Sequence, residues 1–286
     1  METRRLGRTE HHSTVAVLGG AAFAVSDPDE TAAAFADALA RGVNHLDIAP
    51  RYGAAETLVG PVLEPERDRM FVACKTTRRN AGGVRAQLEE SLTKLRTDHF
   101  DLYQMHAVTS LDVLEERADA AAEILRARDE GVVRFAGITG HDLGAPKAFS
   151  EALRRWDLDT VMFPVNARMW ADPAYRADAE ALLETCAERD IGVMAIKAAA
   201  RRPWADTDRF ATTWYEPLME ADAIGRGVSF TLSVPGVHAF CTPGDVRVLR
   251  TALDAAERFS ALDERERSRA IDDAASDPSI FPMPVA

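Results

Sequence analysis

The chain has 286 residues, of which 47% are hydrophobic, and a formal net charge of −12 from 34 basic and 46 acidic residues. This length and composition exclude a small disulfide-stapled scaffold and a wholly disordered chain, because such a chain can bury a substantial core. The acidic balance offers no basic stripe for a phosphate backbone. We therefore expect neither nucleic acid nor a membrane as a partner.

Three scattered cysteines, Cys74, Cys186 and Cys241, show neither a metal-type spacing nor an even pairing. We expect free thiols in a reducing cytoplasm and no bound metal. No apolar segment follows Arg4 and Arg5 as in a signal peptide, and no run approaches the about 18 apolar residues of a membrane span. The sequence predicts a soluble, cytoplasmic protein and leaves its oligomeric state open.

Arginine outnumbers lysine strongly, since Lys75, Lys94, Lys147 and Lys197 are the only lysines among the 34 basic residues. Two explanations of this acidic, lysine-poor composition stay open. A GC-rich genome would favour it, and so would a salt-rich cytosol in which hydrated carboxylates keep a protein in solution.

Short β-branched runs alternate with longer segments of helical period, which is the pattern of a parallel sheet built from βα units. Strands are predicted at residues 15–19, 43–48, 70–75, 100–106, 133–139, 160–165, 191–197 and 237–241. Helices are predicted at residues 30–41, 84–95, 115–130, 146–156, 177–189, 216–232 and 246–259. Eight such units predict an α/β fold, a (β/α)8 TIM barrel. No linker divides the chain, so we expect a single domain over residues 1–286.

The longest irregular segment, residues 202–217, follows the seventh predicted strand and is rich in Trp and Thr. In a barrel it would lie over the mouth, where it could act as a lid. The aromatic residues after strands six and seven could line a substrate pocket or pack in the core; they are Trp170, Trp204, Trp214 and Tyr215.

Functional side chains of such barrels come from the C-terminal ends of strands. Asp47 ends the second predicted strand, Tyr52 follows on the next loop, and Lys75 and His106 end the third and fourth. A lysine ammonium lowers the pKa of a neighbouring phenol, which brings a tyrosine toward use as a general acid or base. We expect Asp47 to hold Lys75, and His106 to donate a hydrogen bond to a substrate oxygen.

The segments that carry these residues resemble the aldo-keto reductase family, and the resemblance covers essentially the whole chain. The opening RRLGRT, the segment LDIAPRYG that contains Asp47 and Tyr52, and DLYQMH before residue 107 resemble family motifs in order and spacing. The resemblance implies reversible NAD(P)H-dependent reduction of an aldehyde or ketone. Hydride would come from the nicotinamide and a proton from Tyr52, on a small-molecule carbonyl or alcohol substrate.

The resemblance also implies contacts to the nicotinamide cofactor at the later strand ends. Thr139, Asn166 and Lys197 are the candidates there. The chain departs from the family pattern at Gly140, Met162 and Ile196, where members carry a carboxamide-binding amide, a glutamine and a stacking aromatic residue.

A barrel phosphate site belongs to the last loops and to a helix N-terminus. The candidates for it, by position, are Gly244, Arg201, Arg202, Arg247 and Arg250. The family's adenine-binding acid and asparagine are replaced by Thr251 and Ala252. NADPH is expected from the resemblance, with NADH possible.

Each assignment has a plainer alternative. A strand-end Lys–Asp pair can be a structural ion pair, Lys197 included, and His141 can be a loop hydrogen-bonder or a substrate or cofactor contact. At the level of the protein, a nicotinamide-binding sensor or regulatory protein with little turnover is one alternative. An isomerase or lyase on the same scaffold is another.

Overall fold

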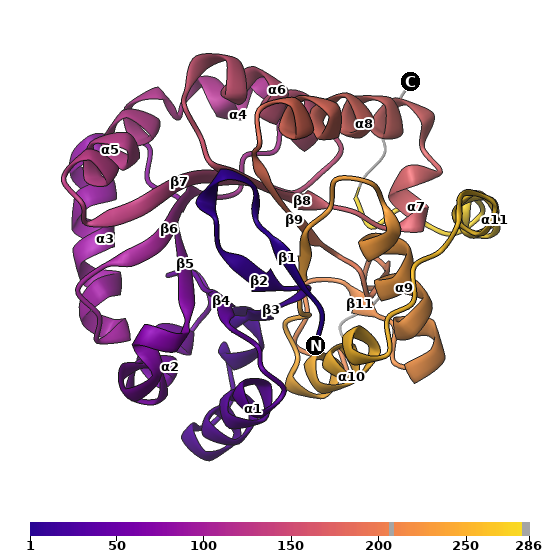
Figure 1. The fold of residues 1–286 in the computed structure, drawn as a ribbon, viewed down its shortest axis with the longest axis horizontal. Coiled ribbons are helices and arrows are strands. Elements are labelled where there is room, and N and C mark those ends of the chain that lie inside the picture. The colour runs from indigo at the N-terminus through magenta and orange to yellow at the C-terminus, as the bar shows by residue number, and fades with distance from the viewer. Residues whose placement is uncertain (206–208, 282–286) are drawn as a thin grey trace.

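A computed structural model describes residues 1–205 and 209–281, and a closed barrel of eight parallel strands forms its centre (Figure 1). In spatial order the strands are β12 (Ala239–Cys241), β3 (Ala16–Gly19), β4 (His45–Asp47), β5 (Phe71–Thr76), β6 (Phe100–Met105), β7 (Val133–Thr139), β8 (Thr160–Pro164) and β9 (Gly192–Ile196). The predicted (β/α)8 barrel is confirmed, and the ends of the eight predicted strands shift by two residues at most.

Helices surround this barrel (Figure 1). They are α1 (Pro28–Ala40), α2 (Ala55–Leu63), α3 (Ala81–Leu95), α4 (Leu111–Glu115), α5 (Ala118–Asp129), α6 (Ala145–Arg155), α7 (Ala167–Trp170), α8 (Pro173–Glu188), α9 (Ala221–Ser233), α10 (Val246–Glu257) and α11 (Glu264–Ala274). The sequence did not predict α2, α7 or α11.

Two predicted helices differ for physical reasons. The helix predicted over residues 115–130 is α5, which begins at Ala118, because residue 115 ends the separate short helix α4. Arg117 lies between them, and its buried guanidinium donates hydrogen bonds to the carbonyl oxygens of Thr77 and Arg78. The helix predicted from residue 216 begins at Ala221, because Glu216–Pro217 forms β11, which pairs antiparallel with β10 (Ala200–Arg202). Proline lacks the N–H group that a helix interior requires.

The N-terminal end of the barrel is closed by a hairpin of β1 (Thr3–Arg5) and β2 (His12–Thr14), which crosses it in Figure 1. Leu6 is fully buried there, and it packs in a cluster with inward-facing strand residues, namely Phe71, Ala73, Leu102, Met162 and Met194. A second, larger cluster lies between the strands and the helices. The barrel interior is therefore a packed core.

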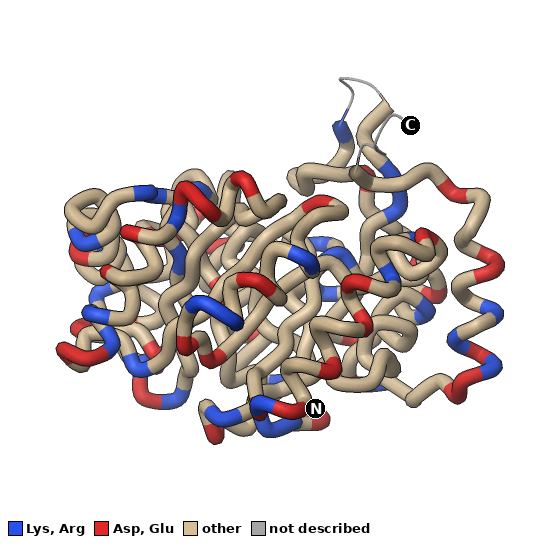
Figure 2. Tube along the Cα trace, turned by 90° about the horizontal axis from the view of Figure 1, so that it is seen from above, with Lys and Arg blue, Asp and Glu red and all other residues tan. Residues whose placement is uncertain are grey.

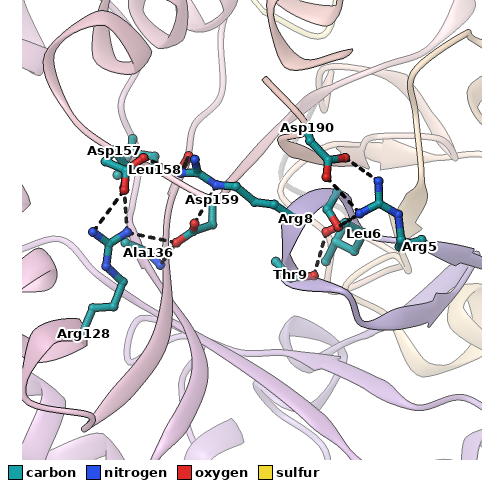
Figure 3. Close-up of polar contacts among 11 residues, drawn as sticks. Arg5, Leu6, Arg8, Thr9, Arg128, Ala136, Asp157, Leu158, Asp159 and Asp190 are labelled. Atoms are coloured by element: carbon teal, nitrogen blue, oxygen red, sulfur yellow. Dashed lines mark hydrogen bonds and ion pairs between the residues drawn. The ribbon is translucent and has the colours of Figure 1, made fainter. Parts of the chain in front are cut away.

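Arginine ion pairs fasten this end (Figure 3). The Nε atom of Arg8 lies 2.8 Å from the Asp159 carboxylate, and Arg5 lies 2.6 Å from that of Asp190. Asp159 also accepts the N–H of Ala136 at 2.9 Å. With the N-terminal end closed, ligands can reach strand-end side chains only from the C-terminal mouth.

Acidic and basic residues alternate along the Cα trace of the described residues (Figure 2), and in this view these residues form no continuous basic stripe. In the described part of the chain, no helix has the length and apolarity to cross a membrane. The described residues likewise contain no group of three or more His, Cys, Asp or Glu placed to hold a metal ion.

Candidate active site

Asp47 and Lys75 form a buried ion pair at the ends of β4 and β5. The Lys75 ammonium contacts the Asp47 carboxylate and lies 3.3 Å from the carbonyl oxygen of Ile48. The two side chains are 2% and 1% exposed. Burial lowers the pKa of Lys75, but Asp47 together with Tyr52 and Cys241 outweighs burial and holds the pKa above its usual value. Lys75 is therefore a permanent cation at neutral pH.

Tyr52 is positioned by a tight turn after β4. The next residue, Gly53, has φ +51°, and a Cβ atom there would lie 2.3 Å from the carbonyl oxygen of Ala24. Only glycine fits this turn. It places the Tyr52 ring centroid 5.2 Å from the Lys75 Nζ atom and 5.9 Å from the His106 ring. The structure thus brings the four predicted residues together.

The pKa of Tyr52 is raised above its usual value, opposite to the expected net direction. Burial raises it, and this effect exceeds the lowering by the neighbouring Lys75 ammonium. The Tyr52 phenol is therefore protonated at neutral pH, as a proton donor must be.

His106 is neutral. Burial lowers the pKa of His106 well below its usual value, and the charge of Lys75 lowers it further. Its Nδ1 atom is buried without a hydrogen-bond partner in the described part of the chain. Arg117 donates to the backbone carbonyl of His106 at 3.3 Å. This imidazole can hydrogen-bond an oxygen without bringing a charge.

Two side chains that the sequence analysis missed also contact Asp47. Gln104 Nε2 lies 3.3 Å from Asp47 Oδ1, and Cys241 Sγ lies 3.7 Å from Oδ2. Gln104 lies opposite Lys75 in the β5–β6 pairing. The alternation of side chains along a strand puts Gln104 on the same face as His106, which was the available signal.

A small cavity of about 50 Å³ lies at this mouth. Asp47, Tyr52, Lys197, Trp214 and Tyr215 contribute to its lining. The Trp214 ring lies 5.5 Å from the Tyr52 ring, so the described part of the 202–217 segment covers the mouth as expected. Residues 206–208 of that segment lie outside the described residues. Pockets for drug-sized ligands measure about 300 Å³ or more, so the lining of this cavity must open for such a ligand to enter.

The other two predicted pocket aromatics lie elsewhere. Trp170 is 4% exposed and packs edge-on against Tyr175 and Phe230 in the core. Trp204 packs against Phe210, with 5.1 Å between ring centroids. The pocket interpretation therefore fits Trp214 and Tyr215 only.

Thr139 ends β7 and lines the cavity together with His141. Burial lowers the pKa of His141 to about 3, and its Nδ1 atom is buried without a partner among the described residues. A Cβ atom on Gly140 would lie 1.8 Å from the carbonyl oxygen of Val108. The backbone after β6 thus leaves no room for an amide residue at position 140.

Asn166 serves the backbone rather than the cavity. Its Oδ1 atom accepts the N–H of Met169 at 2.9 Å, which caps α7, and its Nδ2 atom donates to the carbonyl oxygen of Lys197 at 3.1 Å. Lys197 has φ +74°, an uncommon conformation for a residue with a Cβ atom. Both polar groups of Asn166 are engaged, which leaves them less able to bind the cofactor as expected.

The N-terminus of α10 is capped by a carboxylate of the chain itself. Asp245 Oδ1 accepts the N–H of Arg247 at 3.0 Å, and Oδ2 accepts that of Thr212 at 3.1 Å. The Arg247 guanidinium pairs with the same carboxylate at 3.0 Å. Gly244 lines the cavity. The expected phosphate position thus carries negative charge already.

The remaining candidate arginines lie outside the cavity lining. Arg201 and Arg202 pair with the buried carboxylate of Glu216 at 3.1 and 2.7 Å. Arg250 is exposed on α10. The structure therefore does not gather these arginines into one cluster with Arg247.

The strand-end residues fit the nicotinamide end of a dinucleotide. A carboxamide both donates and accepts hydrogen bonds, and the Thr139 hydroxyl and the unpartnered His141 nitrogen offer both capacities beside Tyr52. The α10 end fits a phosphate less well because of Asp245.

Comparison with known proteins places these residues in a known family. The model of the aldo/keto reductase family matches residues 16–203. An uncharacterized oxidoreductase of Bacillus subtilis, YqkF, is 27% identical over 176 residues, which are 57% of this chain and 55% of that protein. The Escherichia coli methylglyoxal reductase YeaE is 27% identical over 192 residues, 65% of this chain and 57% of that protein. The chain thus spans little more than half the length of these relatives.

A solved structure shows the same architecture. The aldo-keto reductase AKR11C1 from Bacillus halodurans, in its holo form, superposes with a TM-score of 0.74 over 98% of each chain. Its sequence is 21% identical to this one, so the likeness supports the barrel fold.

Proposed function

The chain belongs to the aldo/keto reductase family, and from this premise we propose that it is an NAD(P)H-dependent oxidoreductase that reduces an aldehyde or ketone to an alcohol. The reverse oxidation uses the same groups. The observation that carries the proposal is the cluster of Tyr52, Lys75 and His106 at one end of the barrel, with Lys75 held by Asp47.

Each residue of the cluster has a separate part. Tyr52, kept protonated by burial, donates a proton to the substrate oxygen as negative charge develops there. The Lys75 cation stabilises the phenolate that remains, and Asp47 holds that cation in place. The neutral imidazole of His106 donates a hydrogen bond to the same oxygen, which supports Tyr52 as a small oxyanion clamp.

The cofactor would lie at the mouth with its nicotinamide end at Thr139 and His141. A bound reduced nicotinamide supplies a hydride to the carbonyl carbon. We propose that the hydride donor is NADPH or NADH from the cytoplasm. The ion pair with Asp245 engages Arg247, which leaves this arginine less available to the 2′-phosphate that distinguishes NADPH, and this favours NADH.

Replacement of Tyr52 by Phe tests the proposal. Purified wild-type protein and Tyr52→Phe are titrated with NADPH and NADH by quenching of the four tryptophans, then assayed on a carbonyl panel. The panel includes methylglyoxal, the substrate in the name of the E. coli relative. We expect Tyr52→Phe to bind the cofactor normally and to lose about 10²–10⁴-fold in kcat.

Three outcomes would contradict the proposal. Unchanged kcat in Tyr52→Phe would remove the assigned proton donor. Tight cofactor binding without turnover of any carbonyl would favour a sensor, and no binding of either nicotinamide would favour an isomerase or lyase.

A further inference from the structure

Lys197 is unusual among the lysines of this chain. Only four of the 34 basic residues are lysines. Lys75 pairs with Asp47, Lys94 with Glu90 at 2.6 Å, and Lys147 is exposed on α6. Lys197 is partly buried at the mouth, and no carboxylate of the described residues lies within ion-pair distance of it. Two aromatic rings lie beside it, with Nζ 4.3 Å from the centroid of Tyr215 and 5.9 Å from that of Trp214.

The backbone of Lys197 is held in a costly conformation. Its φ of +74° lies in the left-handed region, which residues with a side chain seldom adopt. The Asn166 side chain and the N–H of Ala200 both donate to its carbonyl oxygen, each at 3.1 Å. Such strain concentrates at functional sites, where the surrounding structure over-determines one geometry.

One indole ring neighbours both Lys197 and the proposed proton donor. The Trp214 ring centroid lies 5.5 Å from that of Tyr52 and 5.9 Å from the Lys197 ammonium, and all three residues line one cavity. A short molecule that displaced this indole would reach Tyr52 with one end and Lys197 with the other.

The charges around the cavity indicate what that second end carries. Among the described residues that line the cavity, Asp47 is the one with an acidic side chain, and the Lys75 ammonium neutralises its charge. The hydroxyl groups of Thr139, Thr213 and Thr242 add no charge. Burial lowers the pKa of Lys197 to about 8, so at neutral pH it is mostly a cation without a counter-ion. A partly desolvated cation is stabilised by an anion from the ligand.

We propose that Lys197 determines substrate specificity by binding a carboxylate, so that the preferred substrates are short aldehydes or ketones that carry a carboxylate group. This inference rests on the proposed reductase function. We assign the anion to the substrate because Lys197 and Tyr52 line one cavity. The NAD(P)H titration of Lys197→Met tests the alternative that the cofactor supplies it.

A matched pair of substrates tests this in turnover. The ω-oxo acids glyoxylate, 4-oxobutanoate and 5-oxopentanoate are compared with their methyl esters, on wild type, Lys197→Met and Lys197→Arg. Lys147→Met is the control, since it makes the same change at an exposed position on α6. We expect wild type to prefer at least one acid over its ester by tenfold or more in kcat/KM. Lys197→Met should lose that preference, measured as the acid-to-ester ratio of kcat/KM within each variant, and Lys197→Arg should keep part of it.

A binding measurement tests the same site without turnover. Quenching of tryptophan fluorescence by butanoate and by neutral butanamide is followed without cofactor, since Trp214 lies beside Lys197. We expect butanoate to bind wild type at least tenfold more tightly than butanamide, and Lys197→Met to bind both equally.

The two arms separate failure of this inference from failure of the proposed function. Equal affinity of wild type for butanoate and butanamide overturns the carboxylate site, whether or not the enzyme turns over. Weaker NAD(P)H binding by Lys197→Met with an unchanged acid preference assigns the ammonium to the cofactor and overturns it too. If no carbonyl is turned over but wild type still prefers butanoate to butanamide, the proposed reductase function is overturned and the carboxylate site is retained.

Discussion

The side-chain amide of Asn166 donates to the carbonyl oxygen of Lys197 at 3.1 Å, and its oxygen caps α7 at the N–H of Met169. One residue thereby ties the end of β9 to the loop after β8. The strained Lys197 backbone depends on this contact.

Replacing Asn166 by Ala should lower the free energy of unfolding by about 1–2 kcal/mol, because a helix cap and a buried hydrogen bond are lost together. Urea unfolding measures the change. Asn166→Asp is the matched control, since it keeps a capping oxygen and lacks the N–H donor, and it should lose less. Stability of Asn166→Ala equal to wild type would show that neither contact contributes.

Lys75→Met should destabilise the protein by about 3–5 kcal/mol, because it leaves the Asp47 carboxylate buried without its partner. The double variant Asp47→Asn/Lys75→Met removes that orphaned charge and should regain more than half of the loss. Arg176→Met breaks the exposed pair with Glu180 and should change stability by less than about 1 kcal/mol. A double variant as unstable as the sum of its single changes would contradict this account.

Local patterns predicted the barrel and the cluster at its mouth. Each strand and the end of that strand could be identified from a window of about ten residues. Because functional side chains of such barrels lie at the C-terminal ends of strands, Asp47, Lys75 and His106 were expected to lie together. Helix α2 was not predicted because Gly60 and Pro61, two residues that disfavour a helix interior, lie inside it. Its end packs closely on α3, where a Cβ on Gly60 would lie 2.1 Å from the carbonyl oxygen of Lys94.

The partners of polar side chains were the part that the sequence could not supply. The Asp245 carboxylate accepts the N–H of Thr212, which is 33 residues away in the sequence. Glu216 forms ion pairs with Arg201 and Arg202, which the sequence position alone had suggested as phosphate ligands. The net pKa shift of Tyr52 also depends on burial in the tertiary structure. Lys75 lowers the pKa of Tyr52 as expected, but burial raises it by more.

Asp245→Asn should shift cofactor preference toward NADPH. Asparagine keeps the α10 cap, while loss of the carboxylate removes a negative charge from the helix N-terminus and releases Arg247. We expect the ratio of the NADPH and NADH dissociation constants to move about 3- to 10-fold in favour of NADPH. Fluorescence titration measures both, and Asp129→Asn on the exposed face of α5 is the control. An unchanged ratio would place the adenosine end of the cofactor away from Asp245.

The pH dependence of acid turnover should follow Lys197. Burial lowers the pKa of Lys197 to about 8, so the ammonium is present below that pH and is lost above it. The described titratable groups nearby stay in one state between pH 7 and 9. Burial raises the pKa of the Cys241 thiol and of Tyr215, so both stay protonated, and His141, with a pKa of about 3, stays neutral.

In that range, kcat/KM for the preferred ω-oxo acid should be level up to about pH 8. Above pH 8 it should fall, approaching tenfold per pH unit, because only the charged form of Lys197 binds the carboxylate. The methyl ester should show no such fall, since it makes no ion pair. Lys197→Arg should keep acid turnover level to pH 9, because a guanidinium stays charged there. A parallel fall for acid and ester would instead assign the titration to a group that serves the chemical step.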